Sequence, residues 1–102
     1  MGGAGQSSYG ASKAGLIDLA KTVAIEGARF NITGNAVIVG IARTDAPLTD
    51  EATETLGKRL LWRRPADPEE IANAVAYLAS EEAKYMTGAS MNMMGGLDLF
   101  VV

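Results

Sequence analysis

Tyr9 and Lys13 are the two side chains whose types and spacing are suited to acid–base chemistry. Residues four apart lie on one face of a helix, and this pair falls near the start of a long helical pattern. An ordinary tyrosine has a pKa of about 10, but a neighbouring ammonium favours the phenolate, and a helix N-terminus acts in the same direction. Tyr9 is therefore a candidate proton donor to a carbonyl or acceptor from an alcohol. Spacing alone leaves a second interpretation open, in which both are only amphipathic residues at a helix edge.

The residue inventory excludes several kinds of chemistry. The chain has 102 residues, no histidine and no cysteine. The absence of histidine rules out the Ser-His-Asp triad, a Cys-His dyad and every histidine-ligated metal site. The absence of cysteine rules out disulfides and thiolate ligands. The sequence therefore predicts no metal site.

Charge and hydropathy narrow the expected partners. The formal net charge is −3, and the longest basic run is the pair Arg63-Arg64, which is not the basic patch that nucleic acid requires. No apolar run approaches the roughly 20 residues of a membrane span, and the N-terminus lacks the basic and apolar regions of a signal peptide. We therefore expect a cytoplasmic protein that binds neither nucleic acid nor membrane.

Helical and strand patterns succeed one another along the chain. The longest pattern has apolar residues at i, i+3 and i+4, and a second apolar stripe beside the first predicts burial between two layers. A β-branched run that ends at Gly40 indicates a fully buried strand. An Asp-Pro-Glu-Glu sequence offers an N-cap, a first-turn proline and a glutamate three residues after the cap. The predicted elements are a helix over 8–29, a strand over 35–39, helices over 50–61 and 67–80, and a strand over 90–94.

The order helix-strand-helix-helix-strand predicts an α/β fold. A strand, a helical crossover and a second strand form a right-handed parallel unit when the strands share a sheet. Two strands alone are marginally stable, and a parallel sheet needs both faces covered. The chain is therefore expected to be part of a doubly wound, Rossmann-like parallel sheet whose other strands lie elsewhere.

The glycine-rich opening matches a phosphate-binding loop only in part. Gly3-Ala4-Gly5 supplies the first two glycines of a dinucleotide fingerprint, but Ser8 occupies the third position. Such a loop follows a strand that aims it at the helix N-terminus, and only two residues precede Gly3. We therefore interpret the opening as the approach to a helix rather than as a phosphate loop.

Four segments resemble, in order, the motifs of the short-chain dehydrogenase/reductase family. Tyr9-Gly-Ala-Ser-Lys13 is similar to its Tyr-x-x-x-Lys segment, and the strand and loop that end at Thr44 are similar to its Asn-Ala-Val-x-Pro-Gly-x-x-x-Thr segment. The other two are Arg64 to Ala72, similar to Arg-x-x-x-Pro-Glu-Glu-Ile-Ala, and Thr87 to Gly96, similar to Thr-Gly-x-x-x-x-x-Asp-Gly-Gly. The resemblance covers essentially the whole chain.

This resemblance implies an oxidoreductase that oxidises small-molecule alcohols or reduces carbonyls with NAD or NADP as cofactor. By resemblance, Tyr9 is the general acid/base, and Lys13 also bonds the nicotinamide ribose. The loop after the strand holds the carboxamide in the family, which implies cofactor contacts from Gly40, backbone groups near Ala42, and Thr44. Hydride transfer itself belongs to the cofactor.

The chain also departs from the family pattern. Val39 stands in place of the loop's proline, Met94 in place of the closing aspartate, and Pro65 follows Arg64. Family members are longer, and their amino-terminal half carries the phosphate loop and the residue that selects NAD or NADP. The resemblance therefore implies that residues 1–102 are the carboxyl-terminal part of such a domain, with the amino-terminal cofactor-binding half missing.

Three functions stay open on these grounds. The first is a dehydrogenase that is weak or inactive as an isolated chain. The second is an oligomerising interaction module without dehydrogenase activity, since the apolar helix face over 16–28 and the tail over 97–102 would be exposed in a monomer. In either case we expect a homo-oligomer or a complementing amino-terminal half. The third is a repurposed hydrolase built on Ser7, Ser8, Tyr9 and Lys13, although Ser-x-x-Lys and Gly-x-Ser-x-Gly are both absent.

Overall fold

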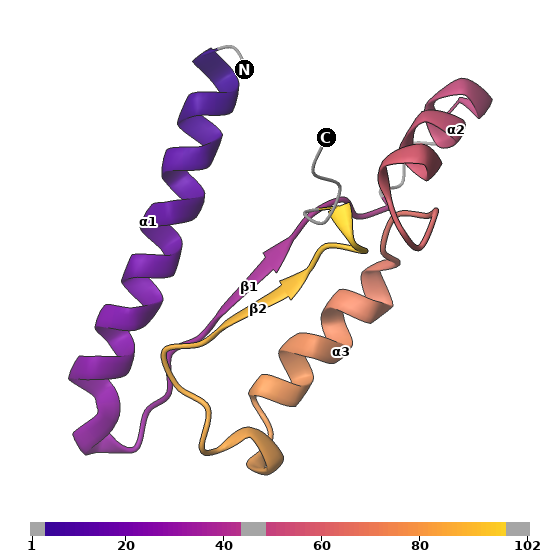
Figure 1. Cartoon of the computed structure of the whole chain (residues 1–102). Helices are drawn as coiled ribbons and strands as arrows, with labels where there is room; N and C mark the ends of the chain where they lie inside the picture. The colour runs from indigo at the N-terminus through magenta and orange to yellow at the C-terminus, as the bar shows by residue number, and fades with distance from the viewer. Residues whose placement is uncertain (1–3, 44–48, 98–102) are drawn as a thin grey trace. The chain divides into compact units, whose positions relative to one another are not determined.

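The computed structural model describes residues 4–43 and 49–97, apart from the side chains of residues 4–9, Thr53 and Leu56. Its elements are α1 (Ala4–Gly27), β1 (Ala36–Val39), α2 (Asp50–Arg59), α3 (Pro68–Leu78) and β2 (Ser90–Met93), with short 3-10 turns at Ala28–Phe30 and Glu81–Ala83 (Figure 1). The chain divides into two compact units, Met1–Val37 with Tyr77–Met91 and Ile38–Ala76 with Asn92–Val102. Helices and a two-stranded sheet make the chain α/β, as the sequence predicted.

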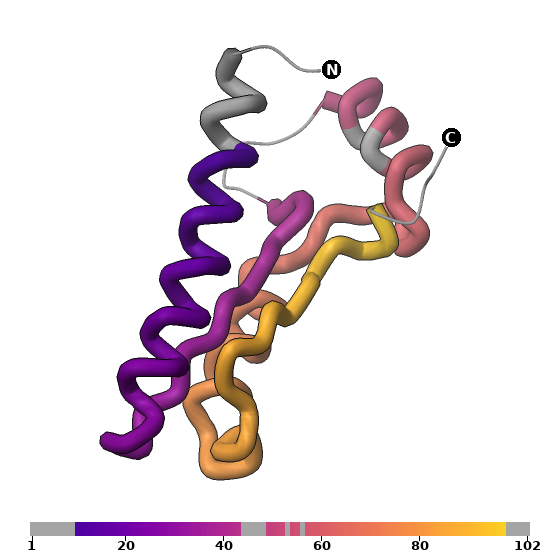
Figure 2. Tube along the Cα trace, turned by 60° about the vertical axis from the view of Figure 1, so that its left-hand side comes forward, coloured from indigo at the N-terminus to yellow at the C-terminus, as the bar shows by residue number. Residues whose placement is uncertain are grey.

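β1 and β2 lie side by side and run in the same direction (Figures 1 and 2). The Ala36 N–H donates to the Ala89 carbonyl at 2.9 Å, and further along both strands the Gly40 N–H donates to the Met93 carbonyl at 3.1 Å. Partners that advance together define a parallel pair. All of β1 is half-buried, so the prediction of a fully buried strand is wrong. The reason is that, among the described residues, β1 has a paired strand on one edge only.

α1 follows its apolar periodicity but is not buried between two layers. Leu16, Leu19 and Ile25 are 62%, 57% and 78% exposed, whereas Ala24 is buried. The periodicity identified which residues are apolar, but it did not establish what covers them, and that prediction of burial is wrong for this chain. The exposure expected for the helix face over 16–28 is present in part, since Ala24 and Gly27 are buried. Residues 98–102 of the predicted exposed tail lie outside the described residues.

A hydrogen-bond network holds the chain just before β1 against the chain just before β2. The Asn35 Nδ2 donates to the Met86 carbonyl at 3.1 Å, and the Asn35 Oδ1 accepts from the Ala89 N–H at 3.0 Å. Beside it, the Thr87 Oγ1 accepts from the Gly34 N–H at 3.1 Å. Because these contacts join two parallel strands at their entrances, they set the register of the sheet.

Asn35→Ala is expected to lower the free energy of unfolding by about 1–3 kcal/mol, because the partners at Met86 and Ala89 lose their hydrogen bonds in a part-buried place. Urea denaturation measures the change. The matched control is Asn73→Ala, since Asn73 is exposed on α3 and its side chain makes no hydrogen bond within the described part of the chain. We expect that control to change stability by less than about 0.5 kcal/mol. Equal losses for both variants would contradict the role given to Asn35.

α3 begins at Pro68, where the sequence predicted a helix start after Asp67. The Asp67 N–H donates to the Glu70 Oε1 at 2.9 Å, which is one half of a capping box, and the Glu70 N–H donates to the Asp67 carbonyl at 2.9 Å. The start of α3 is thus fixed by local contacts.

None of the described helices combines the length and apolarity that crossing a bilayer demands.

Candidate functional site

The two candidate acid–base residues share α1, in the first compact unit. Lys13 is half-buried and follows Tyr9 by one helical turn. The Tyr9 phenol lies outside the described side chains, so its approach to Lys13 stays a prediction from helix geometry. α1 starts at Ala4, earlier than the predicted Ser8, which puts Tyr9 in the second turn. Since the helix dipole acts within the first turn, its expected contribution at Tyr9 is correspondingly small.

The predicted cofactor residues Gly40 and Ala42 lie in the second unit, where the chain changes partner after β1. The Ala66 N–H donates to the Ile41 carbonyl at 2.9 Å, and the Arg43 N–H donates to the Ala66 carbonyl at 2.7 Å. These bonds form a parallel bridge between Ala42 and Ala66. The residue between two such bonds directs its own N–H and C=O to the opposite side. Ala42 therefore presents one donor and one acceptor away from Ala66, the pair of groups that a carboxamide requires.

Gly40 is closely packed against the end of β2. A Cβ at Gly40 would lie 3.2 Å from the Met94 Sδ and 3.3 Å from the Met94 Cα. Met94, which replaces the aspartate of the family motif, is therefore in contact with the segment after β1. Thr44, the remaining predicted cofactor residue, lies outside the described residues.

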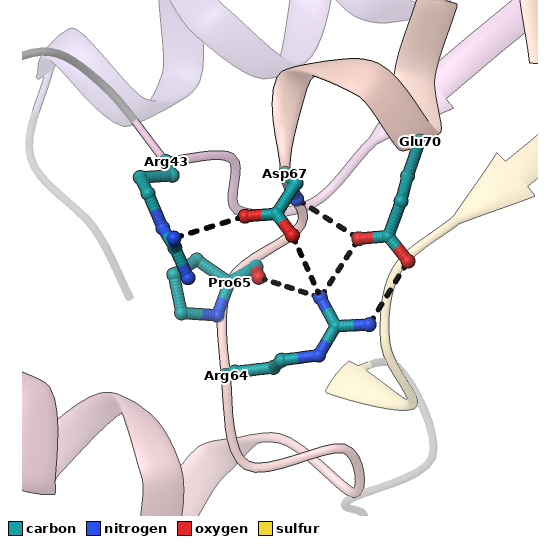
Figure 3. Close-up of polar contacts among 5 residues, drawn as sticks. All are labelled: Arg43, Arg64, Pro65, Asp67 and Glu70. Carbon is teal, nitrogen blue, oxygen red and sulfur yellow. Dashed lines mark hydrogen bonds and ion pairs between the residues drawn. The ribbon is translucent and has the colours of Figure 1, made fainter. Parts of the chain in front are cut away.

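Four charged side chains form an ion-pair cluster at the start of α3, consisting of Arg43, Arg64, Asp67 and Glu70 (Figure 3). Arg64 is bidentate on Glu70, with Nη1 to Oε1 at 2.7 Å and Nη2 to Oε2 at 2.9 Å. The Asp67 Oδ1 lies 3.1 Å from the Arg43 Nη1, and its Oδ2 lies 4.0 Å from the Arg64 Nη1. The Arg43–Asp67 pair was not predicted, because its only signals in the sequence are an arginine after a strand and an N-cap aspartate far along the chain.

The Arg64 guanidinium holds the pKa of the Glu70 carboxyl at about 2, below its ordinary 4.5. The largest cause is the hydrogen bond from Arg64, and the bond from the Asp67 N–H acts in the same direction. The same carboxylate raises the pKa of Arg64. The start of α3 therefore carries a fixed, ionised carboxylate.

Glu70→Gln is expected to destabilise the protein most at neutral pH and least in acid. Because the folded pKa lies below the unfolded one, Glu70 stabilises the fold fully above about pH 4.5, and this contribution is lost as the pH falls through about 2. The difference from wild type should therefore shrink across that window, as measured by urea denaturation at a series of pH values. Glu69→Gln is the control, since Glu69 makes no ion pair among the described residues. A pH-independent difference for Glu70→Gln would contradict the assignment.

A pocket of about 430 Å³ lies within the second unit, beside the ion-pair cluster. Its lining includes Ile41, Trp62, Arg64, Glu70 and Met94. Trp62 is the chain's one tryptophan and is 74% exposed, so its fluorescence reports on this region. In the part of the chain that the structure describes, no group of three or more His, Cys, Asp or Glu residues is placed to hold a metal ion.

Known proteins match this chain along nearly its whole length. Residues 1–98 match the family described as Enoyl-(Acyl carrier protein) reductase. The chain is 43% identical over 98 residues to the 3-oxoacyl-(acyl-carrier-protein) reductase FabG of Rickettsia bellii, covering 94% of this chain and 41% of the relative. It is 41% identical over 101 residues to the (3R)-3-hydroxyacyl-CoA dehydrogenase of Canis lupus familiaris, covering 95% and 38%. A solved structure of a short chain dehydrogenase family protein from Francisella tularensis matches with a TM-score of 0.82 at 30% identity, covering 89% of this chain and 43% of that one.

Helices and a two-stranded parallel sheet, together with the likeness to a solved short chain dehydrogenase family structure, define part of a Rossmann-like oxidoreductase fold. The chain belongs to the short-chain dehydrogenase/reductase family. It spans about two-fifths of the length of the relatives named here, 38% to 43%.

Proposed function

We propose that this chain supplies the acid–base residue and the nicotinamide-side surface of a short-chain dehydrogenase/reductase that interconverts a carbonyl and an alcohol. The observation that supports this most is the outward-facing donor and acceptor of Ala42, produced by the Ala42–Ala66 bridge. Residues 1–102 then form the carboxyl-terminal part of the domain, and the dinucleotide's phosphates bind elsewhere.

The residues present fit a nicotinamide. The Ala42 N–H matches the carbonyl of the carboxamide, and the Ala42 C=O matches its amino group. Gly40 lets the Met94 side chain pack directly against the backbone next to Ala42, Thr44 follows in sequence, and Lys13 is assigned to the ribose. Both NAD and NADP carry this end of the molecule, so both are candidate cofactors. When bound, the nicotinamide supplies the hydride in reduction and accepts it in oxidation.

Proton transfer is assigned to Tyr9. In the reduction, the Tyr9 Oη would donate its proton to the substrate's carbonyl oxygen, and in the oxidation the phenolate would take the alcohol proton back. Lys13, on the same helix face, stabilises the phenolate that remains after donation. This proton, added to the hydride that a bound nicotinamide would supply, completes the conversion of C=O to CH–OH.

The substrate class follows from what the relatives act on by name. One acts on a 3-oxoacyl group on an acyl carrier protein and another on a 3-hydroxyacyl-CoA. Both are acyl thioesters with oxygen at C3. We assign the same class to this chain.

A second candidate function is supported by the apolar surface of α1. Leu16, Leu19 and Ile25 are all more than half exposed in the single chain. Leu16 and Leu19, three residues apart, share one face of α1, and exposed apolar residues that gather on one face mark an association surface. An oligomerising module, paired with its own copies or with a complementing amino-terminal half, would use α1 without any dehydrogenase chemistry.

A labelled-hydride experiment separates the two functions. The chain is incubated with acetoacetyl-CoA, a simple 3-oxoacyl thioester, and NADPH or NADH deuterated at either C4 position, and the product is analysed by mass spectrometry. The proposed activity predicts 3-hydroxybutyryl-CoA with one deuterium at C3 from one of the two labelled positions. If the folded, oligomeric chain yields no labelled product above a protein-free control, the result would favour the oligomerising interaction module over the dehydrogenase.

A further inference from the structure

Two sets of contacts hold the segment after β1 against the chain that leads into α3. The backbone set is the pair of hydrogen bonds from Ile41 and Arg43 to Ala66, at 2.9 and 2.7 Å. The side-chain set is the Arg43–Asp67 ion pair at 3.1 Å (Figure 3). Because Asp67 directly follows Ala66, the ion pair joins the same two segments as the backbone bridge that orients Ala42.

Asp67 is a firm anchor for this ion pair. Its N–H is bonded to the Glu70 Oε1 at 2.9 Å, and its carbonyl accepts from the Glu70 N–H at 2.9 Å, both at the start of a helix. Its second carboxylate oxygen lies 4.0 Å from Arg64, which is itself held bidentately by Glu70. The Arg43 guanidinium thus meets a carboxylate whose backbone is already fixed.

We infer that Arg43 and Asp67 are positioning residues for the nicotinamide carboxamide. Their ion pair keeps the Ala42 N–H and C=O turned outward, and it acts through Ala42 rather than by contact with the cofactor. This inference rests on the proposed function. The two side chains are 56% and 44% exposed, and exposed ion pairs add little to global stability, so their effect on cofactor binding is separable from folding.

The test is a double-mutant cycle on cofactor binding. Arg43→Gln, Asp67→Asn and the double variant are titrated with NADPH and NADH, with Trp62 fluorescence as the signal, at low salt because exposed charges are screened. Arg43→Lys keeps the charge, and since the Arg43–Asp67 contact is a single N···O pair, lysine is able to restore it. Arg59→Gln is the control, an arginine in the last turn of α2 without an ion pair among the described residues.

We expect the effects of the two substitutions on the cofactor Kd to be coupled, and the variants to remain folded. Each single variant raises the Kd for the cofactor about three- to tenfold, the double variant raises it no further than the singles, and Arg43→Lys returns it toward wild type. Arg59→Gln leaves the Kd unchanged, and the melting temperatures of all variants stay within a few degrees of one another.

Three results would overturn the inference. A loss of binding in Arg43→Gln but not in Asp67→Asn would mean that Arg43 contacts the cofactor itself. Additive losses would mean that the two residues act independently. Losses that follow the melting temperature would mean a structural role only.

Amide hydrogen exchange distinguishes failure of this inference from failure of the proposed function. Binding of neither cofactor by the wild-type chain would reject a nicotinamide site formed by this chain alone, and with it the role of the ion pair in cofactor binding. The exchange rates of the amide protons of residues 43 and 66 then test, without any cofactor, whether the ion pair holds the Ala42–Ala66 bridge in place. Faster exchange at those two amides in Arg43→Gln supports it, and unchanged exchange overturns it.

Discussion

Tyr9→Phe is expected to lower kcat/KM for the reduction of a 3-oxoacyl thioester by about 10²- to 10⁴-fold. The substitution removes the phenolic proton donor and leaves the ring, so the cofactor Kd should stay within about twofold of wild type. Both quantities are measurable on one preparation, the first by product formation under mass spectrometry and the second by fluorescence titration.

Tyr85→Phe is the matched control for that experiment. Tyr85 is fully exposed, and its replacement removes the same hydroxyl from a place far from the motif in sequence. We expect no change in either quantity. A Tyr9→Phe variant as active as Tyr85→Phe would remove Tyr9 from the chemistry and reject the assigned mechanism.

Gly34→Ala is expected to lower the free energy of unfolding by about 3 kcal/mol, the upper part of the range for overpacking. A Cβ at Gly34 would lie 2.6 Å from the Ala20 carbonyl oxygen and 3.0 Å from the Ala24 N, both backbone atoms of α1. Since neither atom is able to rotate away, α1 has to shift. For a chain of this size, the melting temperature should fall by more than about 10 °C.

Gly15→Ala is the same chemical change, but it is expected to raise the free energy of unfolding. Gly15 lies inside α1, and beyond its own stretch of helix no described atom lies within 4 Å of an added Cβ. Alanine there should stabilise the helix by about 0.5–1 kcal/mol. If Gly34→Ala behaved like Gly15→Ala, α1 would not pack on Gly34 in solution.

Local rules predicted the start of α3 correctly. The proline and the third-position glutamate lie within four consecutive residues of the chain, and the bond from the Asp67 N–H to the Glu70 carboxylate is the local contact that this spacing predicts. The Asp67 carboxylate instead forms ion pairs with Arg43 and Arg64. The early start of α1 was not predicted, because the opening glycines indicated a break. A helix that is already formed gains a hydrogen bond for each residue added, which favours extension over Ala4 to Ser8.

Long-range partners were the part that the sequence could not supply. Asn35 was recognised as part of a motif, but its bonds to Met86 and Ala89 depend on the pairing of distant strands. The Arg43–Asp67 ion pair likewise forms only once the chain after β1 has turned onto Ala66. In both cases the residue types indicated that the side chains are able to form polar contacts, but the partners that they meet depend on the fold.

The most direct test is a titration of NADPH and NADH, followed by Trp62 fluorescence, in a sample whose mass is measured by light scattering. We predict a defined oligomer of the 10.6 kDa chain that binds one or both cofactors saturably. A folded oligomer that binds neither cofactor would contradict the nicotinamide site and leave Tyr9 and Lys13 without a role in chemistry.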